Sequence, residues 1–261
     1  MDTNILGQSI GTITNTWREQ AARACIRRRL SPLLLTAGGL GLSLVGGALI
    51  GAGFAAPAPL NWPHRVAGVV VLLAGILDLL DDMVARLSEN VTKFTAFSDS
   101  VFDLYADLAI FAGALTYFAA HSSVGFVIVS GIACTGVLTM RYARARAESL
   151  LPGRYKAGYM QRPEWMAVVI ISCLLNRLSV GMTIIAVLSN LATFHRIWDT
   201  RQTAHNLEHP DEAGRGYGSV SAPALMRFWR SVIFWTYLRQ SWQHDLMSGI
   251  ILLVLVLSAF V

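Results

Sequence analysis

Six aspartates stand within thirty residues of a chain that is otherwise strongly apolar. They lie in or beside two hydrophobic stretches, at Asp78, Asp81, Asp82, Asp99, Asp103 and Asp107. A carboxylate removed from water without a partner is costly, so these groups need a partner. Positions three or four apart on a helix share one face. The first two aspartates are three apart and the fourth and fifth are four apart, so two facing helix ends would gather four carboxylates.

Four converging carboxylates repel one another unless they are protonated or neutralised. A divalent cation neutralises them best, and oxygen ligands without a nearby histidine or cysteine cluster favour a hard ion, Mg²⁺ or Mn²⁺. Four carboxylates can hold two such ions about 3.5–4 Å apart, a geometry that suits phosphoryl chemistry. Spacing alone leaves two other roles open, namely ion pairs with arginines and a proton relay.

The composition indicates the environment in which these carboxylates lie. The 261-residue chain is 54% hydrophobic and 14% charged, whereas soluble domains carry about 25% charged residues. An integral membrane protein with one helical bundle is therefore expected. Cys25, Cys134 and Cys173 are isolated in the sequence and are expected to be small apolar fillers. No cleavable signal peptide is expected, and the expected partners include membrane lipids but no nucleic acid.

Six apolar stretches are expected to form transmembrane helices. They cover residues 32–56, 64–84, 99–120, 123–141, 164–177 and 179–197. Most approach the roughly 20 residues that cross the hydrocarbon core of a bilayer. The basic residues, including the dense stretch 141–162, gather on one side, which the positive-inside rule makes cytoplasmic. We expect a multi-pass protein of the inner (plasma) membrane with the aspartates on its cytoplasmic side.

The predicted fold class is an all-α integral membrane protein with three parts. Residues 1–30 are expected to form an interfacial basic helix, residues 31–200 a six-helix membrane domain, and residues 201–261 a C-terminal appendage. The appendage holds a polar linker, an aromatic amphipathic helix and an apolar tail at 246–261, which is marginal in length for a span. No internal repeat is evident, which weakens the interpretation as a transporter built from duplicated halves.

The aspartates also form a longer motif. It runs through Asp78, Asp81, Ala85 and Arg86, and after eight residues through Thr95, Asp99 and Asp103. Here the sequence resembles the CDP-alcohol phosphotransferase family, whose pattern is D-x-x-D-G-x-x-A-R, eight residues, and G-x-x-x-D-x-x-x-D. The four aspartates, the alanine and the arginine are in register, whereas Asp82 and Thr95 stand at the two glycine positions. The resemblance covers residues 30 to about 200.

The resemblance implies a six-helix membrane enzyme that moves a phosphatidyl-type group from a CDP-activated lipid to an alcohol and releases CMP. It implies that two Mg²⁺ or Mn²⁺ ions are held by Asp78, Asp81, Asp99 and Asp103, the last of which also takes the proton of the attacking hydroxyl. The residues implied for binding of the nucleotide or CDP-lipid are Thr36, Asp82, Ala85, Arg86 and Thr95. Thr36 ends a Pro-x-x-x-Thr segment in which Leu33 replaces the asparagine of the family. A homodimer is expected.

A second cluster, in "MRYARARAESLLPGRYKAGYMQRPEW", is basic. Composition alone allows a simple interpretation, the positive-inside signal of a membrane protein. The stretch also resembles the R-A-R-A-E and R-x-E-R segments of prokaryotic phosphatidylinositol-phosphate synthases, which belong to the same family and accept inositol phosphate. By this resemblance the acceptor phosphate is held by Arg144, Arg146, Arg162 and Arg196. Trp165 replaces the second arginine of R-x-E-R.

The sequence therefore predicts transfer to inositol phosphate, a phosphorylated polyol. Glycerol phosphate is the nearest competing acceptor, and a neutral alcohol would leave the arginine cluster unexplained. A non-catalytic membrane protein that retains the fold is the main alternative, and Asp82 and Thr95 favour it. A transporter that uses the aspartates as a cation relay is disfavoured by the missing repeat and by the register of the motif.

Overall fold

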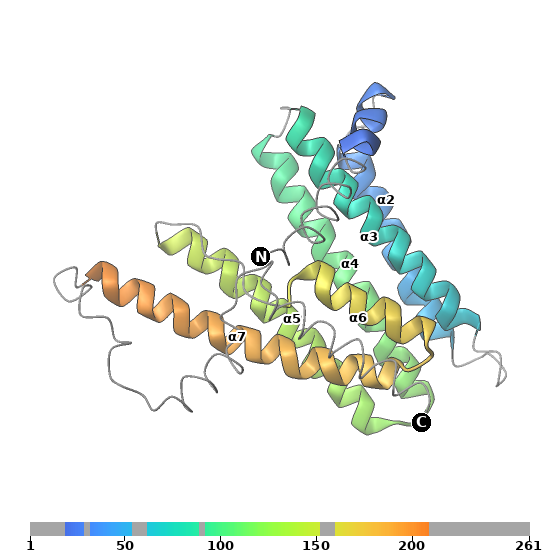
Figure 1. The fold of residues 1–261 in the computed structure, drawn as a ribbon. Helices are drawn as coiled ribbons and strands as arrows, with labels where there is room; N and C mark the ends of the chain where they lie inside the picture. The colour runs from blue at the N-terminus through green and yellow to red at the C-terminus, as the bar shows by residue number, and fades with distance from the viewer. Residues whose placement is uncertain (1–18, 29–31, 54–61, 89–91, 152–159, 209–261) are drawn as a thin grey trace, which may run out of the picture. The chain divides into compact units, whose positions relative to one another are not determined.

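The computed structural model describes residues 19–28, 32–53, 62–88, 92–151 and 160–208, and within these ranges every regular element is a helix (Figure 1). The bounds of the helices are α2 Pro32–Ala52, α3 Trp62–Ser88, α4 Lys93–Ala120, α5 Val124–Leu150, α6 Arg162–Leu174 and α7 Leu178–Glu208. A further short helical segment covers residues 19–27. The prediction of an all-α chain is confirmed for the described residues. Of the predicted appendage at 201–261, residues 201–208 belong to α7 and the rest lies outside the described residues.

Four of these helices are long and apolar enough to cross a membrane. They are Pro32–Ala52, Lys93–Ala120, Val124–Leu150 and Leu178–His205, which fits an integral membrane fold. The remaining two helices differ from that pattern. The α6 helix has only 13 residues, fewer than the roughly 20 that cross hydrocarbon, and α3 has 27 residues but carries three aspartates towards its C-terminal end. Six spans therefore stay a prediction.

The chain folds as two compact units. The first comprises Met1–Val127 with Val169–Leu178, and the second comprises Ile128–Val168 with Ser179–Val261. The predicted division into three parts stays a prediction. Its boundary at residue 200 falls inside α7, and its boundary at residue 30 falls outside the described residues.

In the first unit, α2 packs against both α3 and α4 (Figure 1). Two glycines make the approach of α2 to α4 possible. A Cβ atom added to Gly47 would collide with the Ala109 carbonyl, and one added to Gly113 would collide with the Gly47 carbonyl. Small residues let helix backbones approach closely where no larger side chain would fit. This crossing fixes α2 beside α4, so the aspartate-bearing turns of α4 have a defined position relative to α2.

The short segment 19–27 packs on the same unit. Ala22 is fully buried and lies in one apolar cluster with Leu35 of α2 and Val84 of α3, to which Cys25 also contributes. The basic N-terminal helix is thus anchored on protein at one end of α2 and α3. Its predicted place at the membrane interface stays a prediction. None of the three cysteines forms a disulfide with a described residue, and Cys173 is buried.

At its other end the first unit is held by a polar contact. The His64 side chain of α3 is almost fully buried, and its Nδ1 lies 2.9 Å from the Asn176 Oδ1. Asn176 has φ 57°, a left-handed conformation that asparagine adopts more readily than most residues. It lies in the turn that ends α6 and leads into α7.

In the second unit, polar side chains join α5 to α7. The Asn190 amide donates to the Ile132 carbonyl at 3.2 Å, and the Thr193 hydroxyl lies 3.3 Å from the Gly136 carbonyl. A Cβ atom at Gly136 would collide with the Ser189 side chain. These contacts hold together the two helices that carry the arginines at positions 144 and 196.

Candidate active site

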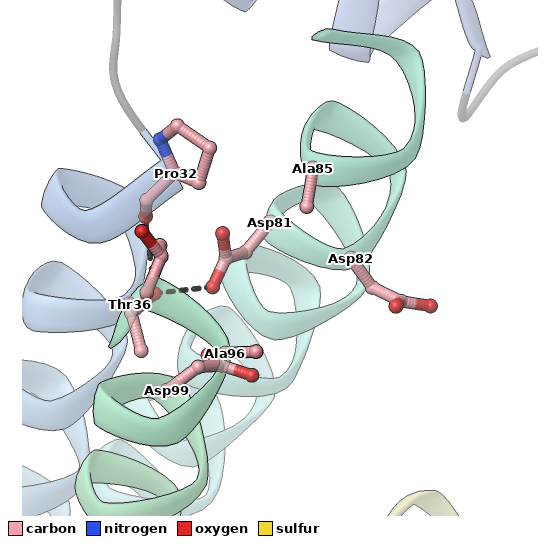
Figure 2. A pocket seen from close by; sticks show the side chains of 8 residues that line it. Pro32, Thr36, Asp81, Asp82, Ala85, Ala96 and Asp99 are labelled. Atoms are coloured by element: carbon pink, nitrogen blue, oxygen red, sulfur yellow. Dashed lines mark hydrogen bonds between the residues drawn. The ribbon is translucent and has the colours of Figure 1, made fainter. Parts of the chain in front are cut away.

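A pocket of about 260 Å³ lies in the first unit where α2 begins, α3 ends and α4 begins (Figure 2). Its lining consists of Pro32, Thr36, Asp81, Asp82, Ala85, Thr95, Ala96 and Asp99. Three separate helices therefore contribute to one site, and two of them contribute aspartates from the motif. The lining contains all the predicted nucleotide-binding residues except Arg86, which lies on α3 with its side chain outside the described part of the structure.

Asp81 is the most buried of the carboxylates that line this pocket, with 5% of its surface exposed. It accepts a short hydrogen bond from the Thr36 hydroxyl, shown by the dashed line in Figure 2. The same hydroxyl lies 3.0 Å from the Pro32 carbonyl, one turn earlier on α2. Ala85, one turn beyond Asp81 on α3, is small and keeps this side of the pocket open. The first turn of α2 therefore holds a carboxylate of α3.

A second carboxylate approaches Asp81 from α4. The Asp99 side chain lies within hydrogen-bonding reach of Asp81, and the charge of Asp78 also acts on it. Two adjacent carboxyl groups in a poorly hydrated place favour a bound cation between them. The donor set, which consists only of oxygens, suits Mg²⁺ or Mn²⁺.

The structure brings together only part of the predicted metal set. Asp81 and Asp99 line the pocket, whereas Asp78 and Asp103 are half-buried on the same helices but are not part of the lining. Within the described ranges no three histidine, cysteine, aspartate or glutamate side chains converge closely enough to form a ready-made metal site. Two ions on four aspartates stay a prediction.

Both residues that stand at the glycine positions of the motif line the pocket. Asp82 is exposed, and Figure 2 shows its carboxylate directed away from Asp81 and Asp99. Thr95 is tied to the start of α4, where Thr92 is the N-cap residue. The Thr92 Oγ1 accepts the Thr95 N–H at 3.1 Å and lies 2.7 Å from the Thr95 Oγ1. The side chains of Asp82 and Thr95 are therefore accommodated at the pocket without displacing Asp81 or Asp99 from its lining.

Two lining residues, Pro32 and Ala96, are not among the predicted site residues, and the buried Asp107 is not in the predicted metal set. Ala96 lines the pocket and lies three residues before Asp99 on α4, so helical spacing was the signal that could have found it. Asp107 is fully buried on the same helix, one turn beyond Asp103. Its position continues the i, i+4 series of aspartates on α4, although it was not included in the predicted metal set.

The predicted acceptor arginines all belong to the second unit. Arg144 on α5 is exposed and forms an ion pair with Glu148 at 2.9 Å. Arg196 on α7 is half-buried, and Arg144, Glu148, Glu164 and Asp199 all lie within electrostatic reach of its guanidinium. Within the described residues its Nε has no hydrogen-bond partner. The structure thus brings two of the four arginines into one charged cluster. The other two are Arg146, exposed on α5, and Arg162, at the start of α6.

Residues 37–198, more than half of the chain, match the family model for CDP-alcohol phosphatidyltransferases. The chain belongs to the CDP-alcohol phosphatidyltransferase family. This confirms the family resemblance predicted from the aspartate motif. Family membership makes the chain an enzyme of phospholipid synthesis, and the transporter interpretation has no support.

Relatives within the family agree with the resemblance drawn from the arginine segment. The chain is 28% identical over 137 residues to the archaetidylinositol phosphate synthase of Pyrococcus horikoshii, a match that covers 52% of this chain and 70% of the relative. It is 27% identical over 161 residues to the phosphatidylinositol phosphate synthase of Mycobacterium tuberculosis, covering 56% of this chain and 73% of that enzyme.

The fold is also similar to solved structures of the M. tuberculosis phosphatidylinositol phosphate synthase. One has CDP-DAG bound and aligns with a TM-score of 0.61 at 26% identity, covering 79% of this chain and 98% of that one. Another, in complex with manganese and citrate, aligns with the same TM-score and identity and is covered over 93% of its length. Sequence and structure therefore place the chain among enzymes of this type.

Proposed function

We propose that the protein transfers the phosphatidyl-type group of a CDP-activated lipid to inositol phosphate and releases CMP. The observation that carries this proposal is the pair of carboxylates, Asp81 and Asp99, in one pocket of a chain that belongs to the CDP-alcohol phosphatidyltransferase family. The names of its relatives, phosphatidylinositol phosphate synthase and archaetidylinositol phosphate synthase, support the choice of acceptor.

The pocket suits the polar part of the donor lipid. Its volume of about 260 Å³ is below that of most pockets for whole drug-sized ligands, about 300–1,000 Å³. It can therefore take the diphosphate and part of the nucleotide, while the acyl chains stay among the apolar helices and the bilayer. A similar chain crystallised with CDP-DAG bound, which supports a CDP-lipid donor.

Asp81 and Asp99 would hold a divalent cation, and Asp78 and Asp103 would complete the set for a second. When bound, Mg²⁺ or Mn²⁺ supplies positive charge that stabilises the diphosphate and makes CMP a better leaving group. The relative that was crystallised with manganese supports this choice of metal. The role of the protein is to orient these carboxylates and to exclude water around Asp81, which is buried.

Asp103 is the proposed general base. It lies one turn beyond Asp99 on α4 and is half-buried. In the reaction the acceptor hydroxyl oxygen forms a bond to the lipid-bearing phosphorus of the donor, the bond from that phosphorus to the CMP oxygen breaks, and Asp103 takes the hydroxyl proton. An ionised carboxylate close to the reacting hydroxyl can serve in this way.

The arginines of the second unit are the proposed site for the acceptor phosphate. Guanidinium groups bind phosphate through paired, charge-assisted hydrogen bonds. Arg144 and Arg196 lie in one charged cluster, and the exposed guanidinium of Arg144 is accessible to a ligand. Glycerol phosphate offers the same phosphate and is the second candidate acceptor. We further propose that the site faces the cytoplasm in the inner membrane, because the basic residues gather on that side. The expected homodimer stays a prediction.

The test is a panel of acceptors given to purified protein with CDP-diacylglycerol and Mn²⁺. When inositol phosphate is the acceptor, we expect release of CMP and formation of a phosphoinositol lipid that retains a monoester phosphate. With free inositol or glycerol phosphate we expect little product. Faster product formation from glycerol phosphate would identify glycerol phosphate as the acceptor. If no acceptor released CMP, the non-catalytic alternative would replace this proposal.

A further inference from the structure

Thr36 is expected from the family resemblance to contact the nucleotide or the CDP-lipid, but its contacts in the structure point to another task. The side chain is buried, with 8% exposed, on the first turn of α2. Its hydroxyl donates to the Oδ2 atom of Asp81, 45 residues further along the chain on α3. The contact joins two helices through a carboxylate that lines the pocket (Figure 2).

The Thr36 hydroxyl is held in place before any ligand arrives. Threonine is branched at Cβ, so its χ1 angle has few choices in a helix. The hydroxyl also lies 3.0 Å from the Pro32 carbonyl, so it has one proton to share between that carbonyl and the Asp81 carboxylate. On the flanks, Leu35 and Val84 are buried in a common apolar cluster, so the two helix backbones are packed together at this level.

The contact restrains the orientation of the carboxylate. Because Oδ2 accepts from Thr36, rotation of the Asp81 carboxylate is opposed by a hydrogen bond to a second helix. An unconstrained aspartate would have to be ordered when a cation binds, at a cost in side-chain entropy. Hydrogen-bonded partners of metal ligands reduce this cost, and their loss typically weakens metal affinity about 10–100-fold.

We propose that Thr36 is a positioning residue that orients the Asp81 carboxylate for a divalent cation in the pocket. The catalytic consequence rests on the proposed function, whereas the effect on cation binding does not. The alternative for the same residue is direct contact with the donor lipid. The two roles differ in what they change, since a positioning residue alters the affinity for the cation and a lipid contact alters the KM for the CDP-lipid.

The test compares Thr36→Val, which keeps the shape but lacks the hydroxyl, with Thr36→Ser, which keeps the hydroxyl. Mn²⁺ binding to each full-length protein in detergent is measured by the loss of the free Mn²⁺ signal in electron paramagnetic resonance, without substrate. We expect Thr36→Val to raise the Kd for Mn²⁺ about 10–100-fold and Thr36→Ser to stay near the parent. At saturating Mn²⁺, Thr36→Val should recover most of its kcat with an unchanged KM for CDP-diacylglycerol.

Thr116→Val is the matched control. The Thr116 hydroxyl donates to the Ala112 carbonyl, four residues earlier, at 2.8 Å, but this exposed side chain of α4 does not line the pocket. The control variant should bind Mn²⁺ as the parent does, and a thermal melt should show that each variant is folded.

Three results would overturn the inference. One is a parent that binds no Mn²⁺, and another is a Thr36→Ser variant as impaired as Thr36→Val. The third is a Thr36→Val variant with normal Mn²⁺ affinity and a raised KM for the lipid. If the parent released no CMP but its Mn²⁺ affinity still depended on the Thr36 hydroxyl, the proposed function would fail and this inference would stand.

Discussion

At the scale of single residues, the site is built around one buried carboxylate. Asp81 is held by Thr36 of α2 and approached by Asp99 of α4, so three helices meet at one side chain. The residues that depart from the family pattern lie at the edge of this arrangement. Asp82 is exposed and directed away from the pair, and Thr95 bonds to the N-cap threonine. Neither departure removes a carboxylate from the pocket.

Asp82→Gly tests the residue that adds a charge at a glycine position of the family pattern. Removing an exposed negative charge from the pocket wall should favour an anionic diphosphate, so we expect equal or higher activity and a KM for the CDP-lipid about two- to fivefold lower. The assay is CMP release at varied CDP-diacylglycerol. Glycine also weakens a helix by about 1 kcal/mol relative to alanine, so Asp82→Ala serves as the control that keeps α3 stable. A loss of activity in both variants would make Asp82 a working ligand.

At the scale of elements, the position of α2 between α3 and α4 determines the site. The pocket exists because the first turn of α2 lies beside the C-terminal part of α3 and the first turns of α4. This position depends on close contact between the backbones of α2 at Gly47 and α4 at Gly113. Neither glycine lines the pocket. A substitution at this helix crossing should therefore change the relative positions of Asp81 and Asp99.

Gly47→Ala should disturb both stability and activity. The added Cβ would collide with the Ala109 carbonyl, which is backbone and cannot turn aside. Overpacking of this kind costs about 1–3 kcal/mol. We expect a lower Tm and reduced CMP release, because α4 carries Asp99. Gly41→Ala on the same helix is the control, since nothing lies within 4 Å of its added Cβ, and its Tm should equal or exceed that of the parent. Equal Tm values for the two variants would refute the close crossing.

The comparison of sequence and structure shows what helical spacing can and cannot predict. Spacing predicted that aspartates of two helices would meet, and Asp81 and Asp99 do so. It could not predict the bond from Thr36 to Asp81, because that bond depends on the register between α2 and α3. Hydropathy predicted a fifth span at 164–177, where the helix has 13 residues and ends at Leu174 before a turn in which Asn176 has positive φ. Spacing could not predict this helix end, and the fifth span stays a prediction.

At the scale of the whole molecule, the residues proposed to bind the donor and those proposed to bind the acceptor lie in different compact units. The pocket with its aspartates belongs to the first unit, and the arginine cluster around Arg196 belongs to the second. If the first binds the donor and the second binds the acceptor, a change in one unit should affect the KM of one substrate. The sequence motifs predicted this division of roles, whereas the boundaries of the units depend on long-range contacts that no local pattern contains.

Arg144→Ala should therefore raise the KM for inositol phosphate with little change in the KM for CDP-diacylglycerol. Loss of a hydrogen bond to a charged group costs about 1.5–3 kcal/mol, which corresponds to about a 10- to 100-fold rise. Glu148→Gln is the control, because it removes the 2.9 Å ion-pair partner of Arg144 but leaves the guanidinium, and it should keep or lower that KM. A rise in the KM of both substrates would contradict the division.

The most direct test of the central claim is transfer by the parent and by Asp99→Asn, measured with labelled inositol phosphate, CDP-diacylglycerol and Mn²⁺. Asp99 lines the pocket beside Asp81, and an amide cannot neutralise a cation as a carboxylate does. We predict one labelled lipid formed for each CMP released by the parent, and loss of both products in a folded Asp99→Asn variant. Undiminished transfer in that variant or in excess chelator, or no labelled lipid from the parent, would contradict the account.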